Sequence, residues 1–209
     1  AIAPLAVVAF TLLAMMNERT ERELVESRRR LQVLAYTDGL TGIANRRHFE
    51  LLAARVLHAG HAPVLLLFDI DHFKTLNDRL GHAAGDRALQ LVGHGLRETL
   101  RAGDIAGRIG GDEFALLLAD TSPRQAVGVA DRLLQRIQSL APAQRLPRLG
   151  LSFGLVHTRA GETVDEALRR ADQALYEAKR QGRSCAVTAL GEEHRPVFSE
   201  SQRLGLTEA

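Results

Sequence analysis

The chain has 209 residues, of which 45% are hydrophobic and 25% are charged, a composition that is typical of globular proteins and excludes wholesale disorder. Its formal net charge of +2 does not require a nucleic-acid partner, and the absence of Trp disfavours an aromatic platform for single-stranded nucleic acid. The one cysteine, Cys185, cannot form a disulfide within the chain, which fits a reducing compartment.

Residues 1–16 contain no charged side chain. As a helix they would span about 24 Å, which is less than the roughly 30 Å hydrocarbon core of a bilayer. We interpret them as the end of a transmembrane helix, and the Arg-rich stretch that follows as its cytoplasmic flank. A buried or coiled-coil helix is the alternative. A signal peptide is disfavoured because the segment has neither a basic start nor a small-residue cleavage site.

Residues 17–36 are predicted to form a charged connecting helix. Leu24 and Leu31 stand seven residues apart, and the companion positions of this weak heptad are Thr20, Ser27 and Leu34. A parallel pair of such helices would bring two copies of the following domain together. A solvated single helix is the alternative, because two of the core positions are polar.

The predicted globular domain covers residues 37–190 and starts with a helix over 46–59 capped by Asn45. The apolar run over 64–68 predicts a buried central strand. Further periodicity predicts helices over 85–101 and 123–140, strands over 149–157 and 184–190, and a helix between these strands with Val164, Leu168, Ala171, Leu175 and Ala178 on one face. Residues 191–209 are polar and are predicted to form a tail.

The stretch "RIGGDEFALLL", residues 108–118, predicts a hairpin. We expect Gly110 and Gly111 to form its tight turn with positive φ. Strands that alternate with helices but include a hairpin indicate a mixed sheet with helices packed on it, rather than a purely parallel sheet.

Acidic residues cluster where two of these elements would meet. Asp69 and Asp71 end the buried strand, and Asp112 and Glu113 follow the Gly-Gly pair. Carboxylates that converge at one rim of a sheet repel one another unless a hard cation joins them, and Mg²⁺ takes oxygen ligands together with substrate phosphates. A helix cap or a surface charge is the alternative reading, above all for Asp71.

The segment "FKTLNDRLGHAAGD" adds groups that suit a nucleotide. Lys74 can neutralise a phosphate. Asn77 offers a donor and an acceptor, and Asp86 accepts from N–H groups, so the pair can read the edge of a guanine. Alternatively, Asn77 is a turn residue and Asp86 a helix cap, with Gly81 and Gly85 allowing a tight loop between them.

Two cations stand near the predicted C-terminal helix end. Lys179 and Arg183 are four residues apart, and they either complement the helix dipole or reach a triphosphate. The scattered histidines, such as His58 and His94, show no metal-ligand spacing and are interpreted as structural. The sequence has neither a GxxxxGK[ST] nor a GxGxxG motif, which leaves a P-loop or a Rossmann site unsupported.

Over residues 36–190 the chain resembles the GGDEF domains of bacterial diguanylate cyclases. The matching segments, in the order of the family, are "DGLTGIANRRHF" (38–49), "FDIDHFKTLNDRLGHAAGD" (68–86), "RAGDIAGRIGGDEF" (101–114), "LSFGLV" (151–156) and "ADQALYEAKRQGR" (171–183). The resemblance implies an α/β (α+β) fold like that of nucleotidyl cyclases and the polymerase palm, with a central, mostly antiparallel sheet surrounded by helices. It also implies condensation of two GTP into cyclic di-GMP with loss of two pyrophosphates.

The resemblance implies roles for individual residues. Asp69, Asp112 and the carbonyl of Ile70 match the ligands of Mg²⁺, with Mn²⁺ as the alternative ion. Asp112 or Glu113 would assist deprotonation of the ribose 3′-hydroxyl. The implied substrate contacts are Asn77 and Asp86 to guanine, His82 as a further contact, Lys74, Lys179 and Arg183 to phosphates, and backbone approach at Gly110 and Gly111.

The stretch "RAGD", Arg101 to Asp104, looks like the RxxD product-inhibition site of the family, where cyclic di-GMP binds as an allosteric inhibitor. Arg132 matches the position of a second arginine from a neighbouring helix. Since each domain would hold one GTP while two phosphodiester bonds must form, the implied active unit is an antiparallel homodimer.

Two rival functions stay open at this point. One is a GGDEF-like receptor that binds cyclic di-GMP or GTP without turnover, which is disfavoured because the signature acids, Lys74 and Asn77 are all present. The other is a palm-type transfer that makes a different cyclic dinucleotide, which Asn77 and Asp86 make less favourable. With residues 1–16 as a membrane anchor, the expected localisation is a cytoplasmic domain of an inner-membrane protein.

Overall fold

The computed structural model describes residues 15–24, 35–60, 62–190 and 193–196. The chain divides into two compact units, Ala1–Thr37 and Asp38–Ala209, each of which is described by itself. Within the described part of the chain, no helix is both long and apolar enough to cross a membrane. Most of the predicted membrane segment, residues 1–14, lies outside the described residues.

In the first unit, residues 15–24 are helical and exposed. Arg19 pairs with Glu23, four residues further along the helix, at 3.0 Å, and such a pair stabilises an isolated helix only weakly. Three of the five predicted heptad positions lie outside the described residues: Ser27, Leu31 and Leu34. The coiled coil therefore stays a prediction.

The second unit is built on one seven-stranded sheet with the order β1-β3-β4-β2-β5-β6-β7. The β1–β3 and β5–β6 pairs are parallel and the other neighbours are antiparallel, so the predicted mixed, mostly antiparallel sheet is confirmed. The strands are β1 (Ala44–Asn45), β2 (Val64–Ile70), β3 (Ile105–Arg108), β4 (Glu113–Leu118), β5 (Leu151–His157), β6 (Ala186–Leu190) and β7 (Glu193–Pro196).

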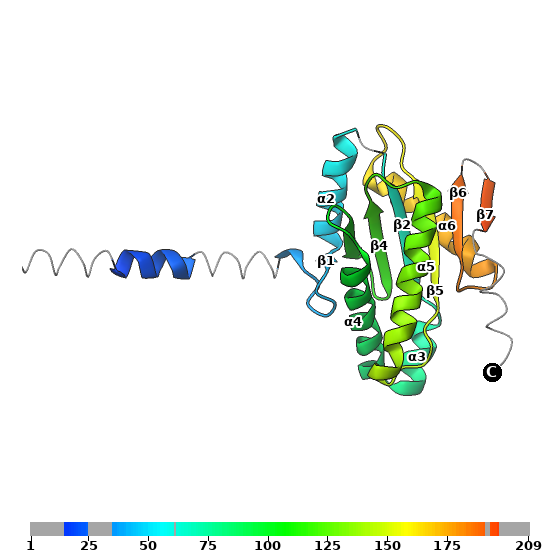
Figure 1. Ribbon diagram of the computed structural model, residues 1–209, viewed down its shortest axis with the longest axis horizontal. Coiled ribbons are helices and arrows are strands. Elements are labelled where there is room, and N and C mark those ends of the chain that lie inside the picture. Colours follow the sequence, from blue (N-terminus) through cyan, green and yellow to red (C-terminus); the bar gives the residue numbers. More distant parts are fainter. Residues whose placement is uncertain (1–14, 25–34, 61, 191–192, 197–209) are drawn as a thin grey trace, which may run out of the picture. The chain divides into compact units, whose positions relative to one another are not determined.

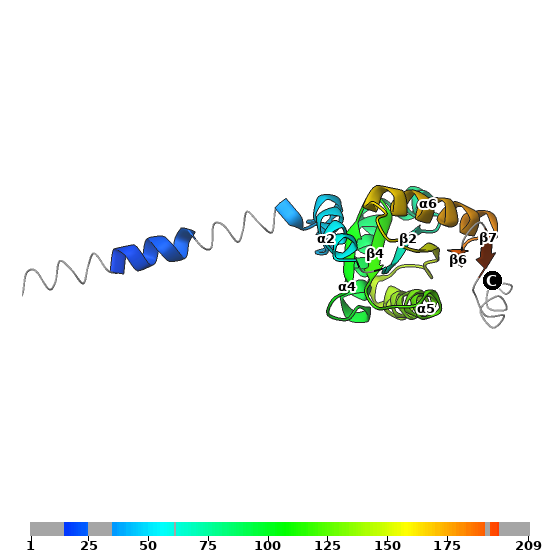
Figure 2. The ribbon, with the colours of Figure 1, turned by 90° about the horizontal axis from the view of Figure 1, so that it is seen from above.

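Helices cover both faces of the sheet, with α4 and α5 on one side and α2 and α6 on the other (Figures 1 and 2). The helices are α2 (Arg46–His58), α3 (Phe73–Leu80), α4 (His82–Thr99), α5 (Pro123–Leu140) and α6 (Val164–Arg180), with a 3₁₀ turn at Ala141–Gln144. The predicted cap is confirmed, because Asn45 accepts from the N–H of His48 at 3.0 Å. A capping box formed by Ser122 and Gln125, which was not predicted, opens α5.

The central strand β2 is buried along its whole length. Its even-numbered residues pack under α4 and α5, where Phe68 lies between Phe114 and Phe153 with ring centroids 5.3 and 5.0 Å away. Its odd-numbered residues, including Leu67, face α6. Because side chains alternate along a strand, the next odd position, Asp69, is directed to the α6 side.

Two local predictions were wrong, and the alternative of Asn77 as a turn residue also fails, because residues 73–80 form the short helix α3. Only Gly81, with φ of 80°, turns the chain between α3 and α4, whereas Gly85 lies inside α4, so there is no loop between these glycines and Asp86 is not a cap. Residues 193–196 of the predicted tail form β7, which pairs with β6.

Candidate active site

Asp69 lies at the C-terminal end of β2 and is only 5% exposed. The ammonium group of Lys179 on α6 forms an ion pair with its Oδ2. The helix comes this close because Gly154 of β5 has no side chain, and a Cβ there would overlap the α6 backbone at Ala171. The fold thus brings together two predicted site residues from distant parts of the sequence.

The second carboxylate oxygen of Asp69 is open, because Oδ1 is buried and has no hydrogen-bond partner. Burial raises the pKa of Asp69, the Lys179 ammonium opposes this, and the nearby carboxylates of Asp112 and Asp71 raise it further. A hard divalent cation fits here, since it would fill the open oxygen and compensate the repulsion between carboxylates. Among the described residues no cluster of three or more His, Cys, Asp or Glu side chains is poised to hold a metal.

The hairpin places a second acidic pair beside this strand end. Asp112 lies in the turn between β3 and β4, and Glu113 is the register partner of Asp69. The expected positive φ is wrong, because neither Gly110 nor Gly111 adopts it. A Cβ on Gly110 would lie 2.6 Å from Oε2 of Glu113, whereas one on Gly111 would meet nothing within 4 Å. Gly110 therefore makes room for Glu113, and Gly111 leaves its backbone open to an approaching molecule.

A network that holds this hairpin escaped the sequence analysis. Arg108 donates to the carbonyl of Gly111 through Nε and Nη2, at 3.0 and 2.7 Å, and to both oxygens of Asp38 through Nη1, at 3.2 Å each. Asp38 also accepts from the N–H and hydroxyl of Thr41. Burial alone would raise the pKa of Asp38, but these hydrogen bonds outweigh it and lower the pKa. The Asp-x-x-Thr spacing could have predicted the turn at Asp38–Thr41, but not the bonds from Arg108 to Asp38.

The predicted guanine pair comes together where α3 packs on α4. Asn77 lies against Gly85, where any Cβ would overlap its Oδ1, and Asp86 follows directly on α4. The Asn77 Oδ1 is buried and lacks a hydrogen-bond partner, so it is an open acceptor for an N–H group. Lys74, His82 and Asp86 are exposed around it.

The segment after α6 carries Arg183, which is exposed. Gly182, Arg183 and Ser184 all have positive φ, of 112°, 62° and 46°. Asp71, the fourth acidic residue of the predicted cluster, bonds to Ser184 in this segment, so it is neither a helix cap nor a free surface charge.

The "RAGD" stretch forms a turn before β3. The N–H of Arg101 donates to Oδ2 of Asp104 at 3.2 Å, and the side chain of Asp104 is 5% exposed. Its Oδ1 forms an ion pair with Nε of Arg101 at 3.6 Å but has no hydrogen-bond partner. The guanidinium of Arg101 donates to the Ala119 carbonyl at 2.6 Å. Arg132 lies exposed on α5, and no hydrogen bond or ion pair in the described part of the chain joins it to this turn.

Comparison with known proteins decides the family. Residues 35–185 match the family model described as "Diguanylate cyclase, GGDEF domain". The chain belongs to the GGDEF family of diguanylate cyclases. The diguanylate cyclase VdcA of Vibrio cholerae is 37% identical over 166 residues, which cover 77% of this chain and 49% of that protein. This GGDEF chain therefore spans about half the length of that curated relative.

Solved GGDEF structures share the fold. The coiled coil and GGDEF domain of DgcB from Caulobacter crescentus, solved in complex with c-di-GMP, has a TM-score of 0.75 and 29% identity, and the match covers 85% of this chain and 97% of that one. SiaD from Pseudomonas aeruginosa, solved with its activator SiaC, has a TM-score of 0.70 and 34% identity, with coverage of 88% and 73%. The predicted fold class is confirmed.

Proposed function

We propose that the chain is an active diguanylate cyclase that condenses two GTP into cyclic di-GMP and releases two pyrophosphates. The observation that carries the proposal is the rim formed by β2, the β3–β4 hairpin and α3. There Asp69 has an open, buried carboxylate oxygen, the nearby carboxylate of Asp112 raises the pKa of Asp69, and Asn77 offers a second open acceptor. Membership of the GGDEF family supports the same reaction.

Asp69, Asp112 and the Ile70 carbonyl would hold a divalent cation, Mg²⁺ or alternatively Mn²⁺. When bound, the ion neutralises charge that builds on the reacting phosphate. With a cation on Asp69, Lys179 would be free to bind a substrate phosphate instead of the Asp69 carboxylate. The open oxygen of Asp69 and the raised pKa of its carboxyl support this assignment.

The remaining site residues bind and orient GTP. Asn77 and Asp86 accept from the N–H edge of guanine, since both present oxygens at the α3–α4 contact, and His82 adds a further contact. Lys74 and Arg183 bind phosphates from exposed positions. Asp112, with Glu113 beside it, assists removal of the proton from the ribose 3′-hydroxyl, and the open face at Gly111 lets the nucleotide approach.

One domain supplies half of the reaction centre. Each 3′-hydroxyl attacks the α-phosphate of the other GTP, so two domains face each other around a two-fold axis as a homodimer. Holding both nucleotides in line converts a bimolecular step into one within a complex, which is the main catalytic contribution beyond charge stabilisation. Residues 17–36 set when two domains meet, and residues 1–16 anchor the chain in the inner membrane.

Cyclic di-GMP inhibits the enzyme at Arg101 and Asp104, with Arg132 as a second contact. The buried Oδ1 of Asp104 supports the site, since it is ion-paired with Arg101 but has no hydrogen-bond partner, which a guanine N–H would supply. Arg101→Ala is expected to leave initial turnover near that of the wild type and to abolish inhibition by added cyclic di-GMP. Unchanged inhibition in this variant would reject the site.

The test of the function is incubation of the purified chain with GTP and Mg²⁺, followed by chromatography for cyclic di-GMP and pyrophosphate. We expect turnover by the wild type and its loss in Asp112→Asn, with the fold checked by circular dichroism. Failure of a confirmed dimer to form product would reject the enzyme. Binding of cyclic di-GMP without turnover would instead identify a receptor.

A further inference from the structure

Asp71 fills both of its carboxylate oxygens with protein donors. Oδ1 accepts from the Ser152 hydroxyl at 2.6 Å, and Oδ2 accepts from the N–H and hydroxyl of Ser184 at 2.9 and 3.1 Å. Its own N–H donates to the Gly150 carbonyl at 2.9 Å. Asp71 therefore differs from Asp69, two residues earlier on β2, whose Oδ1 is open. It ties the end of β2 to the start of β5 and to the segment after α6.

The segment that Asp71 holds has a backbone of high intrinsic energy. Gly182, Arg183 and Ser184 are consecutive residues with positive φ, and two of them have a Cβ. A left-handed conformation in a residue other than glycine persists only where surrounding contacts determine it. The Ser184 N–H bond to Asp71 and the Arg183 N–H bond to the Ala178 carbonyl, at 3.2 Å, are such contacts.

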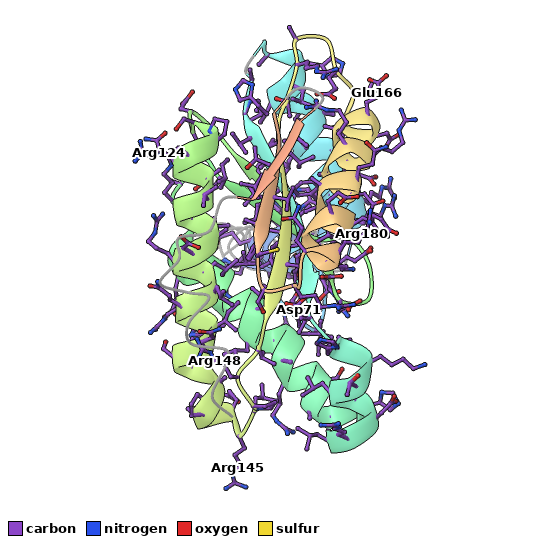
Figure 3. The ribbon with its side chains drawn as sticks, turned by 90° about the vertical axis from the view of Figure 1, so that its right-hand side faces the viewer. Asp71, Arg124, Arg145, Arg148, Glu166 and Arg180 are labelled. Carbon is purple, nitrogen blue, oxygen red and sulfur yellow. The ribbon has the colours of Figure 1, made fainter. Side chains whose placement is uncertain are left out.

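On the outer side of the segment, no packed side chains of the described residues hold residues 182–184 in place of these hydrogen bonds. Residues 182–184 border an open groove of about 730 Å³, whose other walls are α3, the second half of α5 and residues 147–150. On the inner side, a Cβ at Gly150 would lie 2.7 Å from the Asp71 carboxylate, so the glycine admits the close approach. Figure 3 shows Asp71 near the end of α6 that carries Arg180.

We propose that Asp71 is a positioning residue that fixes the 182–184 segment so that Arg183 meets the substrate phosphates in register with Asp69. The inference rests on the proposed function, because it assigns Arg183 to phosphate. The end of β2 then fixes the positions of two groups that bind the nucleotide. It positions Asp69 directly, and it positions Arg183 through the bond between Asp71 and Ser184. Asp71 itself touches neither substrate nor metal.

A double-mutant cycle on GTP turnover tests this coupling. Asp71→Ala and Arg183→Ala are each expected to raise KM for GTP about tenfold, with a smaller effect on kcat, as for loss of one charge-assisted contact. The double variant is expected to match Arg183→Ala alone, because Asp71 acts through Arg183. Asp71→Asn should lie in between, since an amide keeps one acceptor oxygen. Multiplicative effects of the two single changes would overturn the proposal.

Hydrogen exchange supplies a readout that does not depend on turnover. In Asp71→Ala the Ser184 amide should exchange at least about tenfold faster, while amides of β2 stay protected. Ser184→Gly keeps the N–H that bonds to Asp71 but loses the hydroxymethyl group, so its KM should rise less than that of Asp71→Ala. Unchanged exchange at Ser184 would also overturn the proposal. If the wild type makes no cyclic di-GMP, the proposed function fails, whereas hydrogen exchange still tests whether Asp71 fixes the 182–184 segment.

Thr158→Val is the matched control for general damage to the sheet. Thr158 is buried at the opposite end of β5, where its hydroxyl donates to the Pro63 carbonyl at 2.8 Å. The variant should lower Tm without raising KM. An equal rise of KM in Thr158→Val would show that any loss of sheet stability suffices, and the positioning role would fall. If Asp71→Ala does not fold, Asp71→Asn carries the cycle.

Discussion

Asp69 lies near the end of β2 and Asp71 lies just after this strand, two residues further on, yet their surroundings are opposite. Asp69 keeps one open oxygen, whereas Asp71 has both oxygens bonded to serines. Those serines lie 81 and 113 residues further along the chain. The sequence "FDID" shows two acids before a turn, and no local pattern distinguishes a cation ligand from a residue that positions a neighbouring segment. Distant partner atoms make that distinction.

The first prediction concerns Asp69→Asn in the metal-free protein. Burial raises the folded-state pKa of Asp69, so between the unfolded and folded values only the folded chain holds the proton. Stability therefore falls as pH rises through that interval and stays lowered at neutral pH. Thermal unfolding in a chelator should give the variant a higher Tm than the wild type near neutral pH, and the difference should shrink below the ordinary aspartate range.

Addition of Mg²⁺ should reverse this order. At about a hundred times its Kd the ion would stabilise the wild type by roughly 2.7 kcal/mol and leave Asp69→Asn nearly unchanged. Release of Lys179 in the variant costs little, because its side chain is 37% exposed and is hydrated when unpaired. Asp120→Asn, at an exposed turn position, is the control and should respond to Mg²⁺ like the wild type. Equal metal responses of all three proteins would contradict the ligand assignment.

At the scale of elements, the sequence predicted the helices and strands whose own residues carry a clear hydrophobic pattern. The helix over 123–140 and the apolar strand starting at Val64 follow from periodicity and burial alone. The two-residue strand β1 exists only through its pairing with β3, which no local pattern encodes. The hairpin was predicted correctly, but the reason given for its glycines, a positive φ, was wrong. Gly110 is needed because the Glu113 side chain excludes a Cβ there, and tertiary structure positions that side chain.

The hairpin depends on Arg108, which joins it to the turn at Asp38. The side chains of these residues are 16% and 22% exposed, so the ion pair is shielded from solvent. The same guanidinium fixes the Gly111 carbonyl, one residue before Asp112. The network therefore links Asp38, the first residue of the second unit, to the position of the proposed metal ligand.

Arg108→Ala is accordingly expected to lower the free energy of unfolding by about 2 kcal/mol, the range for hydrogen bonds to charged groups. It should also lower kcat, because Gly111 and Asp112 lose their support. Arg108→Lys should recover little, since a lysine cannot bridge two acceptors in the same plane. Denaturant unfolding and steady-state kinetics measure both effects. Arg124→Ala, on the exposed first turn of α5 (Figure 3), is the control, and the network has no special role if both variants lose the same stability.

At the scale of the whole molecule, the fold gathers the proposed site on one rim of the sheet. The ends of β2 and α6, the hairpin and the α3–α4 contact all contribute to it. This rim has groups for one nucleotide: one open acceptor at Asn77 and one open carboxylate oxygen at Asp69. A product with two phosphodiester bonds then requires two rims. Homodimerisation follows from the proposed reaction, and it can be tested without knowledge of the interface.

Mixing active and inactive chains tests this requirement. At constant total protein, above the concentration that saturates dimerisation, an equal mixture of wild type and Asp112→Asn should keep about a quarter of the wild-type rate if both members must be active, and about half if each chain acts alone. In mixed dimers the intact half can still join one 3′-hydroxyl to one α-phosphate with loss of one pyrophosphate. The linear dinucleotide should therefore accumulate in the mixture, and chromatography separates it from cyclic di-GMP. A rate near one half without the linear product would mean that a single rim makes both bonds.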